Sequence, residues 1–248
     1  MFVAASTECF PDLSLTDALD RMVDLEYTGV EFGLIESGKQ LKPSQVHADL
    51  ERAIKLCRDT HRLTPAGYTV DMPEGPDYYA QFASCCKLAK ATKVVAVTVP
   101  AAELGTPFNA EIERLRELVK IASVDGVVVG LKTEVGRLTE NPDTALALCD
   151  NVKGLGITLD PSHYICGPLK GGNYDQLLKF VIHTHLRDTS KEKLQVRVGQ
   201  GEVEYGKLIS QLAMFNYNRA LSVHMPPMPD VDHSGEMRKL RLLLESLL

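Results

Sequence analysis

Acidic and imidazole side chains stand at the ends of five short apolar runs in this sequence. These residues are Glu31, Glu134, Asp160, His185 and His224. Carboxylates and imidazoles bind metal ions, and they also donate and accept protons during catalysis. Burying them among apolar side chains is costly unless a charge partner or a metal ion compensates. The five residues therefore predict a metal centre or an acid–base site, if the fold brings them together.

The spacing of the polar residues predicts that several of them face the same way. Residues two positions apart on a β-strand point to the same side of the sheet. Three such pairs fall at the expected strand ends: Lys132 with Glu134, His183 with His185, and Ser222 with His224. If that side faces the inside of a barrel, which Val, Ile and Leu normally fill, the pairs form a polar mouth.

One divalent cation would account for four of these residues. Glu134, Asp160, His185 and His224 supply two carboxylates and two neutral imidazoles from four consecutive strands. This ligand set favours zinc and would also accept manganese, cobalt or iron, whereas magnesium usually requires more oxygen ligands. Alternatively, each residue is a solvated or hydrogen-bonded loop residue. Their occurrence at corresponding ends of four successive strands favours the metal site.

The elements that would position these residues alternate regularly along the chain. Short β-branched runs predict strands at residues 2–6, 29–33, 63–70, 93–99, 126–134, 154–160, 180–186 and 219–225. Between them, apolar residues spaced three and four apart predict one-faced helices, for example over residues 15–23, 46–57 and 112–122 and from about residue 234. Asn141, Pro142 and Asp143 form a typical helix start.

Eight strand–helix units predict a (β/α)8 barrel that forms one α/β domain over residues 1–248. The usual length of this fold is about 250 residues. A doubly wound open sheet is the alternative, and its nucleotide-binding form lacks support because no G-x-G-x-x-G or P-loop sequence follows a strand. The six cysteines form no C-x-x-C pair, which favours reduced thiols.

Charge and composition limit the expected partners. The 27 basic and 33 acidic side chains give a net charge of -6, which argues against binding of nucleic acid or of an anionic membrane. No apolar run approaches the roughly 18 residues of a membrane span, and the first residues lack the basic segment of a signal peptide. We therefore expect a cytoplasmic protein with a small-molecule partner. Homo-oligomerisation stays open.

Three consecutive segments carry a family resemblance. They are Asp160-Pro161-Ser162-His163, His185-Leu186-Arg187-Asp188 and Gly199-Gln200-Gly201-Glu202-Val203. They resemble the D-x-x-H, H-x-x-D and G-x-G-x-V/I stretches of the xylose isomerase-like barrel superfamily. That superfamily includes sugar isomerases, epimerases and relatives of endonuclease IV, and it also ends its fifth strand in a glutamate. The resemblance implies a TIM barrel that acts on carbohydrates.

The resemblance also implies roles for single residues. Glu134, Asp160 and His185 look like three of the family's four metal ligands, and His163 looks like its substrate-contacting histidine. An arginine near the substrate would be Arg187 or Arg197, and Lys132 is a further candidate for substrate binding. His224 stands where the family usually has a glutamate that serves as metal ligand and acid–base group. This departure argues against the two-glutamate proton shuttle of the ketose epimerases.

These observations favour a metal-dependent isomerase or epimerase of a sugar or sugar phosphate. The metal would polarise a carbonyl, and Glu134 or Glu31 would move the proton on the neighbouring carbon, with His163 as a further catalytic group. The histidine at strand eight leaves a metal-dependent lyase or hydrolase open, and also a barrel without catalysis that binds a sugar or a partner. An endonuclease IV-like activity is disfavoured because it requires more ligands and a less acidic chain.

Overall fold

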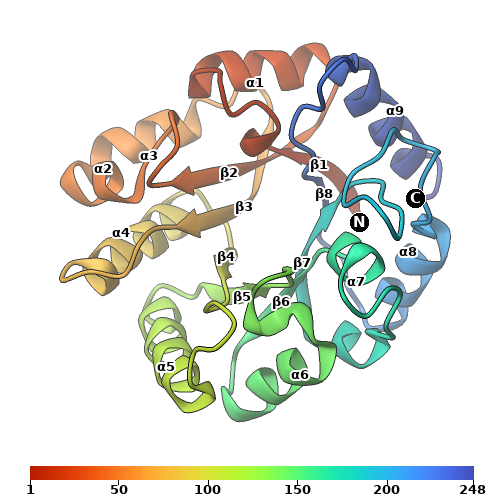
Figure 1. The fold of residues 1–248 in the computed structure, drawn as a ribbon. Helices are drawn as coiled ribbons and strands as arrows, with labels where there is room; N and C mark the ends of the chain where they lie inside the picture. The colour runs from red at the N-terminus through yellow and green to blue at the C-terminus, as the bar shows by residue number, and fades with distance from the viewer.

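The computed structural model describes all 248 residues and contains the eight expected strands as a closed parallel barrel. The strands pair in chain order, and β8 pairs with β1 to close the barrel (Figure 1). Their bounds are β1 Phe2–Ser6, β2 Gly29–Ile35, β3 Thr64–Asp71, β4 Ala96–Pro100, β5 Val128–Lys132, β6 Gly156–Leu159, β7 Val181–Leu186 and β8 Ala220–Val223. The predicted (β/α)8 barrel is confirmed, and the doubly wound alternative is wrong.

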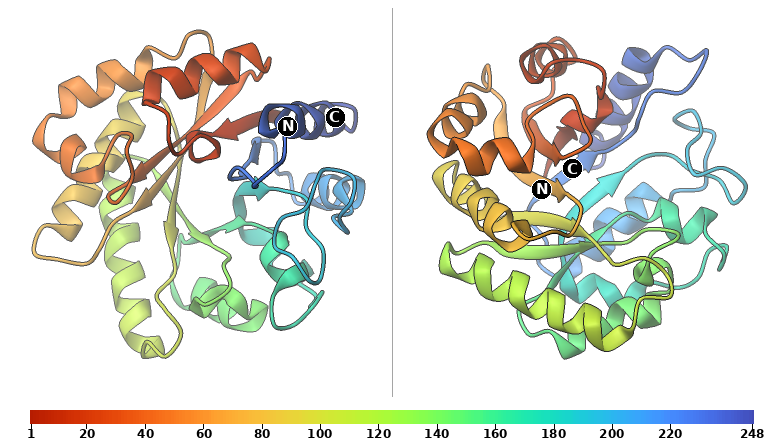
Figure 2. Two further views of the ribbon diagram at one scale, coloured as in Figure 1. Left: turned by 45° about the horizontal axis from the view of Figure 1, so that its top comes forward. Right: turned by 60° about the vertical axis from the view of Figure 1, so that its left-hand side comes forward.

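Helices form an outer ring around the barrel (Figures 1 and 2). The α-helices are α1 Leu15–Asp24, α2 Pro43–Ala48, α3 Leu50–Arg58, α4 Tyr78–Ala91, α5 Phe108–Val124, α6 Pro142–Asn151, α7 Ser162–Cys166, α8 Tyr205–Met214 and α9 His233–Glu245. Three short 3-10 helices are η1 Thr7–Cys9, η2 Leu138–Glu140 and η3 Asp175–Phe180. None of the helices combines the length and the apolar character needed to cross a bilayer.

Local signals explain where two of the helices begin. Asn141 caps α6 as expected, because its side-chain oxygen accepts a hydrogen bond of 2.8 Å from the backbone N–H of Asp143. The single helix expected over residues 46–57 is wrong. Asp49 has φ −147° and ψ 84°, which ends α2, and its carboxylate caps α3 by accepting from the Arg52 N–H at 3.0 Å. The capping ability of an aspartate outweighs the continuous apolar stripe here.

The apolar core lies between the strands and the helices, whereas the inside of the barrel carries polar side chains. Glu31, His183 and His185 are all at most 1% exposed there. The register of β2 against β3 shifts between Val30 and Glu31, at the residue that organises this polar interior. Gly67 on β3 leaves space for the ring of His183, because a Cβ at position 67 would lie 3.0 Å from that ring. All six cysteines are free thiols.

The H-x-x-D and G-x-G segments are joined by direct hydrogen bonds. Asp188 Oδ2 accepts from the backbone N–H groups of Gly199 at 2.7 Å and Gly201 at 3.0 Å. Gly199 has φ +88°, which favours glycine, and a Cβ on Gly201 would overlap the Asp188 carboxylate. Asp188 therefore holds the loop between β7 and α8 in place, so these two motifs fix the shape of the mouth.

Replacing Asp188 with alanine is expected to destabilise the protein by about 1–3 kcal/mol, because two loop N–H groups lose their acceptor. Chemical denaturation monitored by circular dichroism measures the difference. Glu192→Ala changes an exposed carboxylate of the same loop and serves as the control. Equal stability of the two variants would contradict this role of Asp188.

Candidate active site

A cavity of about 440 Å³ opens at the C-terminal ends of the strands. Its ionisable lining consists of Glu8, Lys39, Lys132, Glu134, His163, Arg187 and His224. One cavity is therefore lined by five of the residues singled out from the sequence: Lys132, Glu134, His163, Arg187 and His224. A larger cavity of about 770 Å³ above β3 and β4 contains none of them. In a (β/α)8 barrel, chemistry takes place at this C-terminal end.

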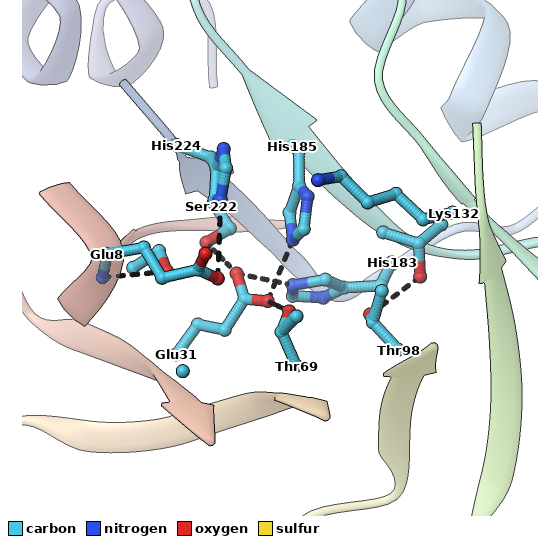
Figure 3. Close-up of polar contacts among 12 residues, drawn as sticks. Glu8, Glu31, Thr69, Thr98, Lys132, His183, His185, Ser222 and His224 are labelled. Carbon is cyan, nitrogen blue, oxygen red and sulfur yellow. Dashed lines mark hydrogen bonds and ion pairs between the residues drawn. The ribbon is translucent and has the colours of Figure 1, made fainter. Parts of the chain in front are cut away.

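Glu31 organises the floor beneath the cavity, where it is fully buried (Figure 3). Its Oε1 accepts hydrogen bonds from Thr69 Oγ1 at 2.6 Å and from His185 Nε2 at 2.7 Å. Its Oε2 accepts from the Ser222 hydroxyl and lies 3.0 Å from His183 Nε2. Burial alone would raise the pKa of Glu31, but the facing rings of His185 and His183 lower it well below its ordinary value. Glu31 is therefore an anion with both oxygens engaged.

The bond to Glu31 determines how His185 can act. Because Nε2 donates to the carboxylate, Nδ1 carries the free lone pair, and this buried atom has no hydrogen-bond partner. Burial lowers the pKa of His185 to about 4, against the opposing effect of Glu31, so the ring is neutral at neutral pH. A neutral imidazole backed by a carboxylate and offering its second nitrogen is typical of a metal-ligating histidine.

Asp160 and His224 stand beside His185 and complete a candidate metal group. One ligand atom from each of the three lies within 4.8 Å of the other two. The rings of His185 and His224 stack with centroids 4.4 Å apart. Burial alone would raise the pKa of Asp160, but Arg187 holds it well below its ordinary value. Two imidazoles and one carboxylate form a donor set that suits zinc or a similar divalent ion.

Glu134 lies outside this metal group. Its Oε1 is 3.2 Å from Lys132 Nζ, and its side chain is 26% exposed, so it faces the cavity. Glu31, His183 and His185 form a second group with metal-ligand spacing. In that group each oxygen of Glu31 already has two polar neighbours, and none of the three residues lines the cavity.

Sequence reasoning missed Glu8, which lies on η1 directly after β1 and lines the cavity. Its Oε1 is 3.4 Å from His224 Nε2, and a Cβ on Gly33 would lie 2.6 Å from its Cγ, so Gly33 provides its space. Burial alone would raise the pKa of Glu8, but His224 and then Lys132 lower it. The rule that strand ends carry the chemistry would have found Glu8 if extended two residues beyond Ser6.

Glu8 and Glu134 lie on opposite sides of the mouth. They follow β1 and β5, which are four strands apart in a closed barrel of eight and therefore face each other. Figure 3 shows Glu8 and Lys132, the partner of Glu134, on either side of His224 and His185. A substrate in this cavity would lie between two carboxylates and above the candidate metal group.

His163 and the two candidate arginines have different surroundings. His163 Nδ1 accepts from the Val135 N–H at 3.1 Å, which leaves Nε2–H pointing toward Asp160 Oδ2 at 3.6 Å. Burial lowers the pKa of His163, so it can act as a neutral hydrogen-bond donor. Arg187 is buried beside Asp160 and lines the cavity, whereas Arg197 is exposed and does not line it.

The chain matches one protein family and several solved structures. A family model described as xylose isomerase-like TIM barrel matches residues 19–245. No curated protein matches the chain. Among solved structures, the chain is similar to 3-keto-D-glucoside 4-epimerase YcjR from E. coli, with 15% identity, a TM-score of 0.76 and 99% of both chains covered.

Two further solved structures show the same fold. An L-ribulose 3-epimerase is 14% identical with a TM-score of 0.75, and the match covers 99% of this chain and 95% of that one. The IOLI protein with a binding zinc atom is 15% identical with a TM-score of 0.75, covering 100% of this chain and 99% of that one. At such identities the likeness concerns the fold alone.

Proposed function

The chain belongs to the xylose isomerase-like TIM barrel family, and from this we propose that it is a metal-dependent isomerase or epimerase of a sugar or sugar phosphate. The observation that carries the proposal is the pair Glu8 and Glu134, which face each other across one cavity above His185 with its free Nδ1. The epimerases among the similar structures support the same reaction class.

Asp160, His185 and His224 are the residues that would hold the metal. The fit rests on the buried, unpartnered Nδ1 of His185 and on the spacing of the three ligand atoms. A bound divalent ion would supply polarisation of the substrate carbonyl, which acidifies the hydrogen on the adjacent carbon. Glu31 does not line the cavity, so our proposal gives it the positioning of His185 and not the removal of a proton.

The two half-buried carboxylates that line the cavity, Glu8 and Glu134, would move the proton. Glu134 takes the proton from the substrate carbon on one face, and the electron pair of the C–H bond moves toward the polarised carbonyl oxygen. For this step Glu8 must first take a proton from solvent, against its lowered pKa, and it then gives that proton to the opposite face of the carbon, which inverts it. Exchange with solvent afterwards removes the proton from Glu134. The order reverses for the other epimer. His224 at strand eight therefore does not prevent a two-base reaction, because Glu8 from the end of β1 supplies the second carboxylate.

Neighbouring side chains would bind the substrate and orient its reacting carbon toward Glu8 and Glu134. Lys132 and Arg187 bring positive charge to the cavity, where they can bind hydroxyl, carbonyl or phosphate oxygens. His163 would donate from Nε2 to a substrate hydroxyl, since Val135 fixes its other nitrogen as the acceptor. These contacts favour a small polar carbohydrate.

Exchange of substrate hydrogen into heavy water tests the proposal. The purified protein, supplied with zinc or manganese, is incubated with a panel of ketoses, aldoses and their phosphates, and products are analysed by NMR and mass spectrometry. We expect one deuterium at the carbon beside the carbonyl in a product otherwise of unchanged mass. Chelator treatment should abolish the exchange, and added metal should restore it. Products of cleaved mass would indicate a lyase or hydrolase, and absence of exchange in the whole panel would contradict the proposal.

A further inference from the structure

Arg187 places a positive charge among the ligand atoms of the candidate metal group. Its Nη2 donates to Asp160 Oδ2 at 2.6 Å and to His224 Nδ1 at 3.0 Å, and the side chain is only 6% exposed. Two of the three residues that would hold a divalent ion are thus engaged by one guanidinium nitrogen. The buried Nδ1 of His185 and Nε2 of His224 have no hydrogen-bond partner. Because His224 Nδ1 accepts from Arg187, its Nε2 carries the hydrogen, and Nδ1 is the atom with the lone pair.

We propose that Arg187 is an internal competitor of the divalent ion, so that the guanidinium and the metal hold Asp160 and His224 in alternation. The inference rests on the metal site of the proposed function. It adds that this chain carries its own replacement cation, which lowers the affinity of the site for metal and keeps the buried Asp160 paired when metal is absent.

The Arg187 guanidinium and a metal ion cannot bind His224 Nδ1 at the same time. His224 Nδ1 has one lone pair, which can accept from Arg187 or bind an ion but cannot do both. A zinc ion binds its oxygen and nitrogen ligands at about 2.0–2.2 Å, closer than Arg187 Nη2, which lies 2.6 Å from Asp160 Oδ2 and 3.0 Å from His224 Nδ1. An ion bound to both atoms would therefore be in close contact with Nη2. Two like charges at such a separation in a buried site repel strongly. Binding of metal through these atoms therefore requires Arg187 to move.

The cavity beside Arg187 offers space for its displaced side chain. Its side chain lines the cavity of about 440 Å³, whose walls also carry the carboxylates of Glu8 and Glu134. Its Nε is buried without a hydrogen-bond partner, so only Nη2 holds the guanidinium to the floor. A displaced Arg187 would keep its charge near two acidic groups and near the substrate.

Metal affinity of an Arg187→Met variant tests the competition. Methionine keeps an unbranched side chain of similar reach but removes the charge and the donors. Calorimetric titration of the chelator-treated protein with zinc or manganese should give affinity about 10–100-fold tighter than that of the wild type, the factor that corresponds to one charge-assisted hydrogen bond. The metal-free variant should also melt at a lower temperature, because Asp160 loses its partner, and should gain more in melting temperature from added metal.

Two further variants complete the test. Arg197→Met removes an exposed arginine from the neighbouring loop and should leave the metal affinity unchanged. Arg187→Lys keeps the charge but loses the fork of donors, so its affinity should fall between wild type and Arg187→Met. The lysine variant also serves if Arg187→Met does not fold.

The outcomes separate this inference from the proposed function. Equal or weaker metal binding by the Arg187 variants would overturn the competition and leave the metal site in place. Absence of metal binding in the wild type and in the variants alike would overturn both the metal site and the competition. Tighter binding by the variants supports the competition whether or not any sugar in the exchange panel is turned over.

Discussion

Glu8→Gln is expected to lower the rate of epimerisation by about 10²–10⁴-fold, the usual contribution of a positioned acid–base group. The amide fills the same space beside Gly33 and His224 but can neither accept nor release the proton. Because Glu134 on the opposite side stays intact, the variant should still exchange the hydrogen of one epimer with heavy water. It should not convert that epimer into the other.

The same substitution at the opposite carboxylate, Glu134→Gln, tests whether each glutamate serves one face of the substrate. In Glu134→Gln the rate of epimerisation should fall by a similar factor of about 10²–10⁴. This variant should exchange the hydrogen of the opposite epimer only. Glu51→Gln, which makes the same change at an exposed carboxylate of α3 away from the cavity, is the control and should retain the wild-type rate. If both glutamine variants exchange the same epimer, or if Glu8→Gln is as active as the wild type, the two-carboxylate arrangement does not operate.

Glu31→Gln should weaken metal binding by about 10–100-fold, although Glu31 does not line the cavity. The carboxylate accepts from Thr69, His185 and Ser222, whereas an amide is uncharged and has only one acceptor oxygen. The charge-assisted bond that keeps the proton of His185 on Nε2 and its lone pair on Nδ1 is then weakened. Calorimetric titration with zinc measures the effect.

A matched control separates this role from general stability. Loss of hydrogen bonds to a buried charged group costs about 1.5–3 kcal/mol, so Glu31→Gln should also unfold at lower denaturant concentration. Thr69→Val removes one donor to the same oxygen but leaves the charge and the His185 bond intact. It should therefore lose stability with little change in metal affinity. Equal metal affinities of Glu31→Gln and the wild type would contradict the proposal that Glu31 positions His185 for metal binding.

The barrel could be predicted because its signals are local and repeated. Each strand is a short apolar run, and each helix shows its own apolar stripe, so the eight units can be counted without knowing their contacts. The helix break at Asp49 escaped this reasoning, because the apolar stripe continues across a residue whose side chain caps the next helix. Local capping competes with periodicity, and the sequence alone does not show which one prevails.

The site was predictable only as far as strand ends reveal it. Asp160, His185 and His224 could be singled out because each lies within one residue of the last residue of its strand, and the barrel then places them side by side. Glu8 was missed because it lies on a 3-10 helix beyond its strand, and its position depends on Gly33 of the next strand.

The sequence alone could not show whether Arg187 or Arg197 lies near the substrate. Arg187 and Arg197 are only ten residues apart, and their difference arises from contacts across the barrel. Arg187 meets Asp160 from β6 and His224 from β8, whereas Arg197 lies exposed on the loop held by Asp188. Such long-range pairing follows from the closed barrel and is not encoded in spacing along the sequence.

Anomalous diffraction from crystals soaked in manganese is the most direct measurement of the metal site. It should give one peak per chain within coordination distance of Asp160, His185 and His224, with the Arg187 guanidinium displaced from Asp160. A peak bound only by other residues, or none among these three side chains at saturating manganese, would contradict the account.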